Sequence, residues 1–453
     1  MFLKSITLEN IRSISELTLD FTEGVGVRAW TYLLGENGCG KSTVLKAIGL
    51  VMAGADAAVD LVGEQDSWIR LGEDEASIEV HYQTAAGEQR SAAYRFKRGG
   101  NTREFLYANQ ESMDQLNRAI EKSARNYFVV GYGVNRYGSA RDEQGSISRG
   151  SRRRMSNPRA SAVSSLFNLD TQLISLEGWA MDLDYRRGEV AMDAVRRALD
   201  NLLPDVTFSH IDRERRQLVF RTVDGELPLA ALSDGYQAIA TWCGDLLFQI
   251  TETFEDYTDP LSARGLLLVD EIDLHLHPVW QRELVSFIKE TLPNIQVVVT
   301  THSPLTVHQA GENELYVIRR THGEGSRIEA FAGAPNRLLL HQLIQSPLFG
   351  LHTLDSPVVE KMRGELRELQ GIGKSSVQVT PGREQRIEEL SAALEDAADW
   401  SAGRPSLDRS SEALEQIGDI LSKAKGLGTP DRGTLPRFLR GYPDGGESTA
   451  DDS

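Results

Sequence analysis

Cysteine and long apolar runs are scarce in this chain. Its 453 residues contain two cysteines, Cys39 and Cys243. Cys39 falls inside a glycine-rich loop, so we expect no structural disulfide, and a reducing compartment fits this usage best. No uninterrupted apolar stretch reaches the roughly 20 residues that a membrane-spanning helix requires, and Met1–Ser5 lacks the pattern of a signal peptide. These absences predict a soluble, cytoplasmic protein.

Basic residues are outnumbered by acidic residues in this chain. The formal net charge is −17, which argues against a protein that coats nucleic acid indiscriminately. The exception is the stretch 139–162, where serine, glycine and arginine dominate. Its arginines are Arg149, Arg152, Arg153, Arg154 and Arg159. Three interpretations are open: they bind the phosphates of DNA or RNA, they pair with an acidic partner surface, or they are simply solvated. No aromatic residue is interleaved, which weakens a single-strand stacking interpretation.

The most informative motif is Gly35–Thr43, which fits the P-loop pattern G-x-x-x-x-G-K-[ST]. An apolar run at 30–34 precedes it and a helical pattern at 44–48 follows, which is the strand–loop–helix context that a P-loop requires. The glycines allow backbone N–H groups to point inward at a helix N-terminus and so cradle phosphate. Lys41 is predicted to reach the β- and γ-phosphates, and Ser42 to hold Mg²⁺. The predicted nucleotide contacts are Asn37, Gly38, Cys39, Gly40, Lys41, Ser42 and Thr43.

Later in the chain, polar residues follow two further apolar runs. Asp270 and Glu271 end the run that begins at Gly265. A buried strand that delivers two acids at its carboxyl end places charge where open α/β sheets bind ligands. Asp270 suits Mg²⁺, directly or through water, and Glu271 suits the base that orients the attacking water. His302 ends the run at 295–301, and it is either a sensor of the γ-phosphate or a satisfied core histidine.

A weaker motif, Leu232–Gln237, precedes a helical run at 238–250. Ser233 at an N-cap, followed by Gly235, leaves a helix N-terminus open as a second anion site. The pattern L-S-x-G occurs often by chance, so its weight depends on the motifs around it.

Two turns carry polar residues that admit more than one interpretation. Arg12 lies in the Asn10–Ser13 turn between two predicted strands, and it is either solvated or approaches the bound phosphates. His275 and His277 form a His-x-His pair. We favour a turn at which two copies of the protein touch over a metal site, because no acid or cysteine set at ligand spacing completes the pair.

Taken together, these motifs resemble the ABC-type ATPase superfamily in order and spacing, over roughly residues 1–335. Asn10–Ser13, Leu232–Gly235, Asp270–Pro278 and Thr300–Pro304 are similar to its RecF/Rad50/OLD-like branch, also labelled AAA_21 or AAA_15. The resemblance implies an enzyme that hydrolyses ATP to ADP and phosphate with Mg²⁺. It assigns catalytic roles to Lys41, Glu271 and His302, and it implies that Ser233 and Gly235 complete the nucleotide site of another copy. ATP binding would then be linked to formation of a homodimer or higher oligomer.

The chain departs from the superfamily pattern in two places. No clear Q-loop glutamine follows the strand predicted at 127–130, and Gly131–Arg136 stands there instead. Polar residues in that stretch either approach the nucleotide site or belong to an ordinary glycine-rich turn. Fewer than about 200 residues separate Gly35–Thr43 from Leu232–Gln237, and no sustained heptads fill them, which excludes long coiled-coil arms.

The predicted fold class is α/β: a P-loop NTPase with an ABC-type head and a helical C-terminal extension. The head comprises a mixed or parallel core sheet, an antiparallel β subdomain and a helical insert. Strands are expected at 2–8, 16–21, 30–34, 77–82, 92–97, 127–130, 206–211, 217–223, 226–229, 265–269, 295–301 and 314–318. Helices are expected from 44, at 110–125, over most of 162–203, at 238–250 and 279–290, over 336–370 with a break at 346–352, and at 384–398 and 408–424.

We expect five parts along the chain. They are an N-terminal ATPase lobe with the P-loop (1–138), a basic loop and helical insert (139–205), a C-terminal ATPase lobe (206–335), a helical extension (336–440) and a disordered acidic tail (441–453). No Toprim-like acidic cluster is identifiable after residue 335, so we expect no nuclease within this chain.

Three functions are compatible with these features. The first is an ATPase of the kind found in Septu-type anti-phage systems, a resemblance that implies a separate HNH-type nuclease partner. The second is a RecF-like ATPase that clamps DNA in repair. The third is a scaffold that binds ATP with little turnover.

Overall fold

In the computed structural model, two compact units divide the chain, Met1–His352 and Thr353–Ser453. The structure describes residues 1–24, 26–84, 86–123, 127–136, 157–188, 192, 195–197, 199–200, 203, 206–254, 260–274, 276–321, 325–351, 353–370 and 381–401. Arg149, Arg152, Arg153, Arg154 and His275, the helix predicted at 408–424 and the tail predicted at 441–453 therefore lie outside the described residues. The five-part division proposed from sequence stays a prediction.

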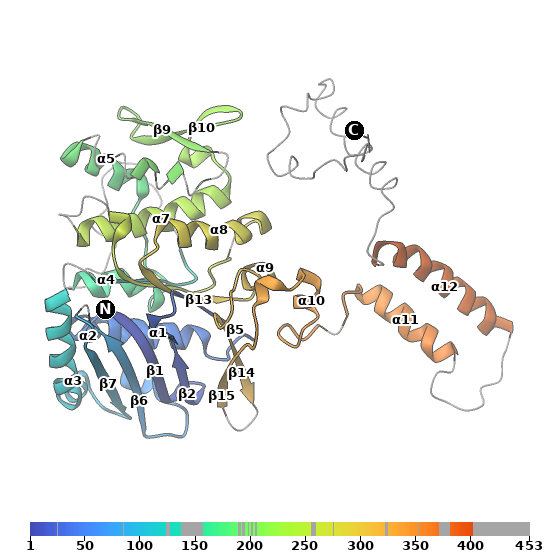
Figure 1. Cartoon of the computed structure of the whole chain (residues 1–453), viewed down its shortest axis with the longest axis horizontal. Helices are drawn as coiled ribbons and strands as arrows, with labels where there is room; N and C mark the ends of the chain where they lie inside the picture. The colour runs from blue at the N-terminus through green and yellow to red at the C-terminus, as the bar shows by residue number, and fades with distance from the viewer. Residues whose placement is uncertain are drawn as a thin grey trace, which may run out of the picture. The chain divides into compact units, whose positions relative to one another are not determined.

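A six-stranded sheet forms the centre of the first unit, in the order β15-β14-β5-β13-β12-β8 (Figure 1). Five neighbouring strands pair in parallel, and β15 adds an antiparallel edge. The strands are β5 (Trp30–Gly35), β8 (Phe128–Tyr132), β12 (Gly265–Val269), β13 (Ile295–Thr301), β14 (Leu315–Thr321) and β15 (Gly325–Ala330). This mixed sheet confirms the predicted α/β class. Only β15 was missed, because Gly325–Ala330 contains no apolar run.

The strands in the middle of the central sheet are buried on both faces, and successive residues of β12 enter different cores. Leu266 and Leu268 belong to one core, whereas Leu267 and Val269 belong to the other. A strand buried on both sides reads as a continuous apolar run. This is why the sequence around 265–269 and 295–301 shows no alternation of polar and apolar residues.

One core lies between the central sheet and a four-stranded antiparallel sheet, in the order β2-β1-β6-β7. Helices on this side also contribute to the core (Figure 1). The elements are β1 (Phe2–Ile11), β2 (Ile14–Asp20), β6 (Glu75–Gln83), β7 (Gln89–Lys97), α1 (Lys41–Met52), α2 (Ala55–Leu61), α3 (Thr102–Ser123) and α4 (Pro158–Val163). The strands predicted at 2–8, 16–21, 77–82 and 92–97 are present, and they form two antiparallel pairs, β1 with β2 and β6 with β7.

The other core is covered by longer helices and a three-stranded sheet, in the order β11-β10-β9. These elements are α5 (Leu176–Arg187), α7 (Asp234–Thr253), α8 (Pro278–Thr291), β9 (Thr207–Asp212), β10 (Gln217–Thr222) and β11 (Gly225–Pro228) (Figure 1). Among the helices that the structure describes, none is long and apolar enough to cross a membrane.

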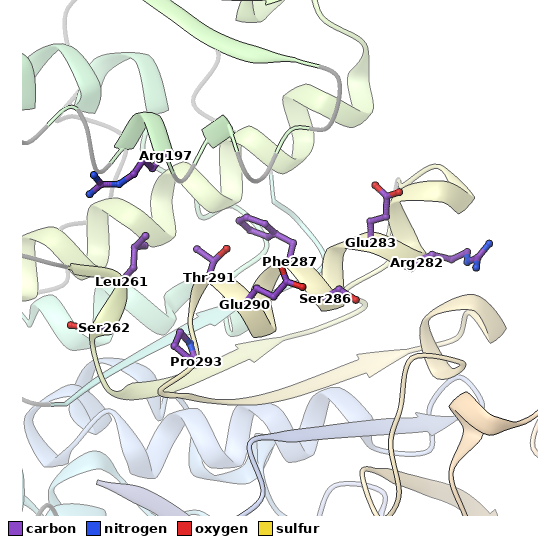
Figure 2. A pocket seen from close by; sticks show the side chains of 10 residues that line it. All are labelled: Arg197, Leu261, Ser262, Arg282, Glu283, Ser286, Phe287, Glu290, Thr291 and Pro293. Carbon is purple, nitrogen blue, oxygen red and sulfur yellow. The ribbon is translucent and has the colours of Figure 1, made fainter. Parts of the chain in front are cut away.

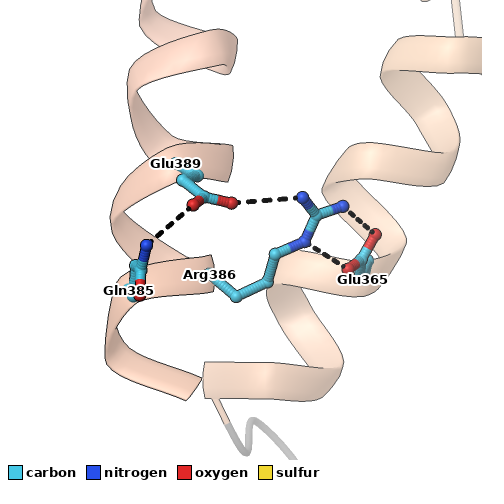
Figure 3. Close-up of polar contacts among 4 residues, drawn as sticks. All are labelled: Glu365, Gln385, Arg386 and Glu389. Atoms are coloured by element: carbon cyan, nitrogen blue, oxygen red, sulfur yellow. Dashed lines mark hydrogen bonds and ion pairs between the residues drawn. The ribbon is translucent and has the colours of Figure 1, made fainter. Parts of the chain in front are cut away.

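The expected helical stretch at 336–370 is shorter than predicted. The helices there are α10 (Leu340–Ile344) and, in the second unit, α11 (Pro357–Gln370), so the predicted break at 346–352 is present. A further helix of that unit, α12 (Pro381–Ser401), covers the predicted 384–398. Arg386 of α12 donates two hydrogen bonds to Glu365 of α11, at 2.8 and 3.2 Å, and a third to Glu389, at 3.3 Å (Figure 3). All three side chains are exposed, so this network adds little stability.

Candidate nucleotide site

The carboxyl ends of three parallel strands bring the predicted polar residues to one edge of the central sheet. β5 ends at the P-loop, β12 ends at Asp270, and β13 ends just before His302. Because β13 pairs in parallel with both β5 and β12, these ends lie side by side. Residues that are 235 positions apart, such as Gly35 and Asp270, thereby converge, as expected for a ligand site of an open α/β sheet.

The P-loop adopts a backbone that glycine permits. Gly38 and Gly40 have φ angles of 77° and 108°, and Gly40 directly precedes α1. Both angles lie in the left-handed region, which side chains with a Cβ rarely adopt. At Gly35 the restriction is space, since a Cβ there would approach the carbonyl oxygen of Ile318 to 2.3 Å. The loop can therefore curl tightly around the start of α1.

Lys41 is buried, and its side chain is hydrogen-bonded to the backbone of the P-loop. Its Nζ donates hydrogen bonds to the carbonyl oxygens of Gly35, at 2.8 Å, and Glu36, at 3.0 Å. Burial lowers the pKa of Lys41, while the nearby thiol of Cys39 and the carboxylates of Asp270 and Glu271 raise it. The ammonium thus lies close enough to the acids at the end of β12 to be influenced by them.

Thr300, near the end of β13, organises the two acids. Its Oγ1 donates to Oδ1 of Asp270 at 2.6 Å and accepts the backbone N–H of Glu271 at 2.7 Å. Asp270 is only 6% exposed, so this hydrogen bond compensates for a buried carboxylate. Glu271 has a φ of 49°, which is uncommon for a residue other than glycine. Such a backbone persists where surrounding contacts enforce it.

His302 lies at the same edge but is exposed. Burial lowers its pKa, and so does Lys41, whereas Glu271, Asp273 and Asp270 raise it. The neutral imidazole is therefore favoured at neutral pH. The next residue, Ser303, donates to Oε1 of Gln281 at 2.6 Å and fixes the start of the following turn. The structure thus brings His302 to the acids, and its role toward phosphate stays a prediction.

Arg12 occupies a strained turn beside the P-loop helix. Its φ is 52°, its Nε donates to the carbonyl oxygen of Ser67 at 3.0 Å, and its guanidinium lies 5.1 Å from the ring centroid of Trp68. Burial lowers the pKa of Arg12. Arg12 lines a pocket of about 220 Å³ with Arg70 and Arg320. These contacts show that Arg12 is a held side chain rather than a freely solvated one, whereas a phosphate contact remains a prediction.

The Leu232–Gln237 stretch lies at the start of α7, where Leu232 is buried and Ser233 is exposed. Ser233 is the exposed N-cap, and its side chain makes no capping hydrogen bond. No atom lies within 4 Å of a Cβ placed on Gly235. Among the described residues, no hydrogen bond joins either residue to the P-loop. The role of Ser233 and Gly235 in a nucleotide site therefore stays a prediction.

Of the two histidines at 275 and 277, only His277 lies among the described residues, and the metal interpretation of the pair is not tested. His277 caps α8, where its Nδ1 accepts the N–H of Val279 at 3.4 Å. In the part of the chain that the structure describes, no group of three or more histidine, cysteine, aspartate or glutamate side chains is placed to hold a metal ion.

Sequence reasoning did not single out two residues at this edge. One is Thr300, whose position before Thr301 and His302 was noted only as part of a motif. The other is Arg136, which follows β8 and donates from Nη2 to the carbonyl oxygen of Asp270 at 2.9 Å and also to that of Glu271. A polar side chain just past a buried strand was the available signal. What it contacts depends on the pairing of β8 with β12.

A further hollow of the described surface lies elsewhere. It measures about 780 Å³ and is lined by one face of α8 and by Leu261, Ser262 and Pro293 (Figure 2). Leu261 and Ser262 precede the amino end of β12, and Pro293 precedes that of β13. The hollow therefore opens near the edge of the sheet opposite the P-loop, and we assign the nucleotide site on chemistry rather than on size.

The residues at the carboxyl edge fit ATP and Mg²⁺. The loop has open space at Gly38, because nothing lies within 4 Å of a Cβ placed there. At Gly40 the space is tighter, since a Cβ would approach Ile14 to 3.1 Å and Ser13 Oγ to 3.2 Å. Lys41 supplies a cation that already donates to the loop carbonyls. Ser42 and Asp270 offer oxygen ligands, which Mg²⁺ prefers, with water and phosphate completing its octahedron.

A P-loop that opens a helix after one parallel strand, with paired acids after a neighbouring strand, defines a P-loop ATPase. Comparison with known families agrees with this class. The family model described as "AAA domain, putative AbiEii toxin, Type IV TA system", AAA_21, matches residues 31–308. The match covers more than half of the chain, and the chain belongs to this family. The family membership inferred from the motifs is thereby confirmed.

Individual proteins are similar to this chain over much of its length. The chain is 27% identical over 355 residues to the Septu protein PtuA of Bacillus mycoides (strain KBAB4), covering 78% of this chain and 45% of that protein. It is 24% identical over 353 residues to the Septu protein PtuA of Bacillus thuringiensis, covering 70% and 76%. The chain thus spans less than half the length of the first relative. The SMC head domain from Thermotoga maritima aligns with a TM-score of 0.42 and 16% identity, covering 73% of this chain and 99% of that one.

Proposed function

We propose that this chain binds and hydrolyses ATP at the carboxyl edge of its central sheet. The observation that carries the proposal is the arrangement at the end of β12, where Thr300 holds both Asp270 and Glu271 beside the P-loop lysine. In a P-loop site, backbone N–H groups and the lysine bind the phosphates, and Mg²⁺, when bound, neutralises charge between the β- and γ-phosphates. Ser42 and Asp270 would hold the metal.

In this proposal Glu271 acts on the attacking water. Its carboxylate accepts a hydrogen bond from the water and so orients it toward the γ-phosphate. Lys41 stabilises the negative charge of the phosphoryl group, and the exposed side chain of His302 would contact the terminal phosphate. Water adds to the γ-phosphorus as the bond to ADP breaks, which yields ADP and phosphate.

The first test replaces Glu271 with glutamine. Glu271→Gln keeps the shape of the side chain but removes its basicity, so phosphate release should fall about 10²- to 10⁴-fold. Binding of a fluorescent ATP analogue should change little, because the P-loop is intact. Lys41→Met is the matched variant, and it should lose both activities. Wild-type turnover that is unaffected by Glu271→Gln would remove Glu271 from the mechanism, and a wild type without turnover would favour an ATP-binding scaffold.

We further propose that the site is completed by a second copy of the chain. Ser233 is exposed at the N-cap of α7, Gly235 is half-buried with open space around its Cβ position, and no hydrogen bond among the described residues joins either one to the P-loop of its own chain. An open helix N-terminus presents N–H groups that suit the γ-phosphate of a nucleotide held by another copy. Binding of ATP would then stabilise a dimer or higher oligomer, since a ligand that contacts both copies favours the assembled state.

The Septu relatives support a defence role with a separate nuclease. On the resemblance to Septu-type systems, we propose an HNH-type nuclease partner that the ATP-dependent assembly holds or releases. Purification with the product of the neighbouring gene, with and without ATP, followed by measurement of the mass of the complex, tests this role. A complex of unchanged mass that contains only this chain under both conditions would contradict both the ATP-linked assembly and the partner.

A further inference from the structure

The stretch after β8 occupies the place where the resemblance led us to expect a glutamine. β8 pairs in parallel with β12, and Tyr132 stands opposite Val269. The ladder continues past the last paired residues, because the N–H of Asp270 donates to the carbonyl oxygen of Tyr132 at 2.8 Å. The chain that follows β8 therefore runs beside the two acids, and Arg136 is four residues beyond the end of the strand.

Arg136 contacts the backbone of both acids. Its Nη2 donates to the carbonyl oxygen of Asp270 at 2.9 Å and also donates to the carbonyl oxygen of Glu271. Two consecutive carbonyls can meet one cation only where the backbone turns, and Glu271 has a φ of 49°. The guanidinium stabilises this uncommon conformation by satisfying both oxygens, while Thr300 binds the N–H of Glu271 from the other side.

Charge adds to the hydrogen bonds. Burial lowers the pKa of Arg136 to about 10, whereas Asp270, Asp273 and Glu271 raise it. The side chain is therefore a cation at neutral pH and has three carboxyl groups close by. Both hydrogen bonds come from Nη2, whose two N–H groups have fixed directions in the guanidinium plane, whereas an ammonium on a flexible stem is less well preorganised.

β8 is also anchored to the helix that begins at the exposed Ser233. The hydroxyl of Tyr132 donates to Oδ2 of Asp245 on α7 at 3.0 Å, and the rings of Tyr132 and Trp242 lie 5.6 Å apart. Asp245 is only 3% exposed, so this contact lies within the core. The segment that carries Arg136 is thus attached to α7 at one end and to the two acids at the other.

We propose that Arg136 is a positioning residue: its bonds to the backbone of Asp270 and Glu271 fix the direction of the Glu271 carboxylate for hydrolysis. This inference rests on the proposed ATPase function. Arg136 contacts neither phosphate nor the attacking water in this proposal, and as a cation it does not take over a metal contact from a glutamine. Its effect reaches the reaction only through Glu271.

The experiment compares Arg136→Lys and Arg136→Met with the wild type. Loss of a group that orients a reacting side chain typically costs about 10- to 100-fold in activity. We expect that loss in kcat for Arg136→Met and a smaller one for Arg136→Lys, which retains one charged donor. The affinity for a fluorescent ATP analogue should stay within about threefold of the wild type, because the P-loop is unchanged.

A second readout needs no nucleotide and no activity. Amide hydrogen exchange in the 270–274 segment should become about tenfold faster in Arg136→Met, because the turn loses the hydrogen bonds from the guanidinium. Arg98→Lys is the matched control, since Arg98 also donates to two backbone carbonyls, those of Glu73 and Arg70 at 2.8 and 2.9 Å, but on the antiparallel sheet. Its exchange at 270–274 and its kcat should equal those of the wild type.

The two readouts separate the failure of this inference from that of the proposed function. Unchanged exchange at 270–274 in both Arg136 variants would overturn the positioning role, and so would a loss of ATP affinity equal to the loss of kcat. An equal loss in Arg98→Lys would also overturn it. A wild type without turnover would end the proposed function, and the exchange result would still decide whether Arg136 fixes the turn.

Discussion

The turn at Asp270–Glu271 and the start of α7 differ sharply, although both are predicted to face one nucleotide. In the first, Thr300 and Arg136 contact the backbone and side chains from two sides, and Asp270 is almost fully buried. In the second, Ser233 is exposed with no capping hydrogen bond, and Gly235 faces open space. The parts of the site that belong to one chain are held in place, whereas the part expected to serve another copy is free to receive a ligand.

The contrast shows where preorganisation is needed. A carboxylate that orients water must keep its direction before substrate arrives, because misplaced groups lose much of their catalytic effect. A surface that joins its target only on assembly must instead remain accessible. The two regions thus support a site divided between copies, and the predictions below test that division.

The largest expected effect is recovery of activity by mixing two inactive variants. Lys41→Met removes the phosphate-binding cation, and Ser233→Trp blocks the exposed helix start. If Ser233 acts in the other copy, a mixed dimer retains one intact site out of two. An equal mixture should therefore recover about one quarter of wild-type phosphate release, from random pairing of copies in a symmetric dimer.

The control for this mixture is the double variant that carries both substitutions in one chain. Mixed with the wild type, it offers no intact composite site in the heterodimer, so turnover should fall below that of the diluted wild type. Absence of recovery in the first mixture, with both single variants folded by circular dichroism, would place Ser233 in the site of its own chain or outside any site.

A smaller effect is expected at Asp273, which follows the Asp270–Glu271 turn. Its carboxyl group is less completely hydrogen-bonded than that turn. Its Oδ1 is buried without a hydrogen-bond partner, and burial raises its pKa, although a hydrogen bond from Thr301 lowers it. A pKa above the unfolded value means that ionisation costs more in the folded state, and this cost grows as pH rises through that range. Asp273→Asn should therefore raise Tm by about 1–2 °C near neutral pH.

The gain should shrink as the pH falls through the raised pKa of the folded state, and it should vanish only well below the ordinary pKa of 3.8, where the wild-type carboxyl is neutral in both states. Thermal unfolding of both proteins across this range measures the difference. A Tm lowered by Asp273→Asn at neutral pH would show that the carboxylate is better paired than these contacts indicate.

The smallest effect concerns anion binding by the arginines at 152–154 rather than by the buried P-loop lysine. Replacing Arg152, Arg153 and Arg154 with alanine should weaken DNA binding and reduce the slope of log affinity against log salt by about 2 to 3. Binding of the ATP analogue should stay unaffected. Filter binding at several salt concentrations provides the measurement, and an unchanged slope would assign this loop to a protein contact or to solvent.

Much of the architecture was predictable because its signals are local. The P-loop, the buried strands at 265–269 and 295–301 and the antiparallel hairpins follow from motif and periodicity alone. The contacts of Arg136 could not be predicted from the sequence. They depend on the pairing of β8 with β12, and the residues that Arg136 contacts are more than 130 positions away in the chain. The strained backbone of Arg12 and Glu271 was equally invisible, since no residue type at those positions requires a positive φ.

The two hydrogen bonds from Lys41 Nζ to its own loop have a consequence for selectivity. Without nucleotide, the ammonium already has partners in the carbonyl oxygens of Gly35 and Glu36. An incoming anion therefore competes with an internal solvation shell and gains only the difference between the two. A singly charged or loosely fitting anion gains little by this exchange, whereas a triphosphate offers several oxygens and additional backbone contacts. The two hydrogen bonds of Lys41 would thus favour highly charged ligands over smaller anions.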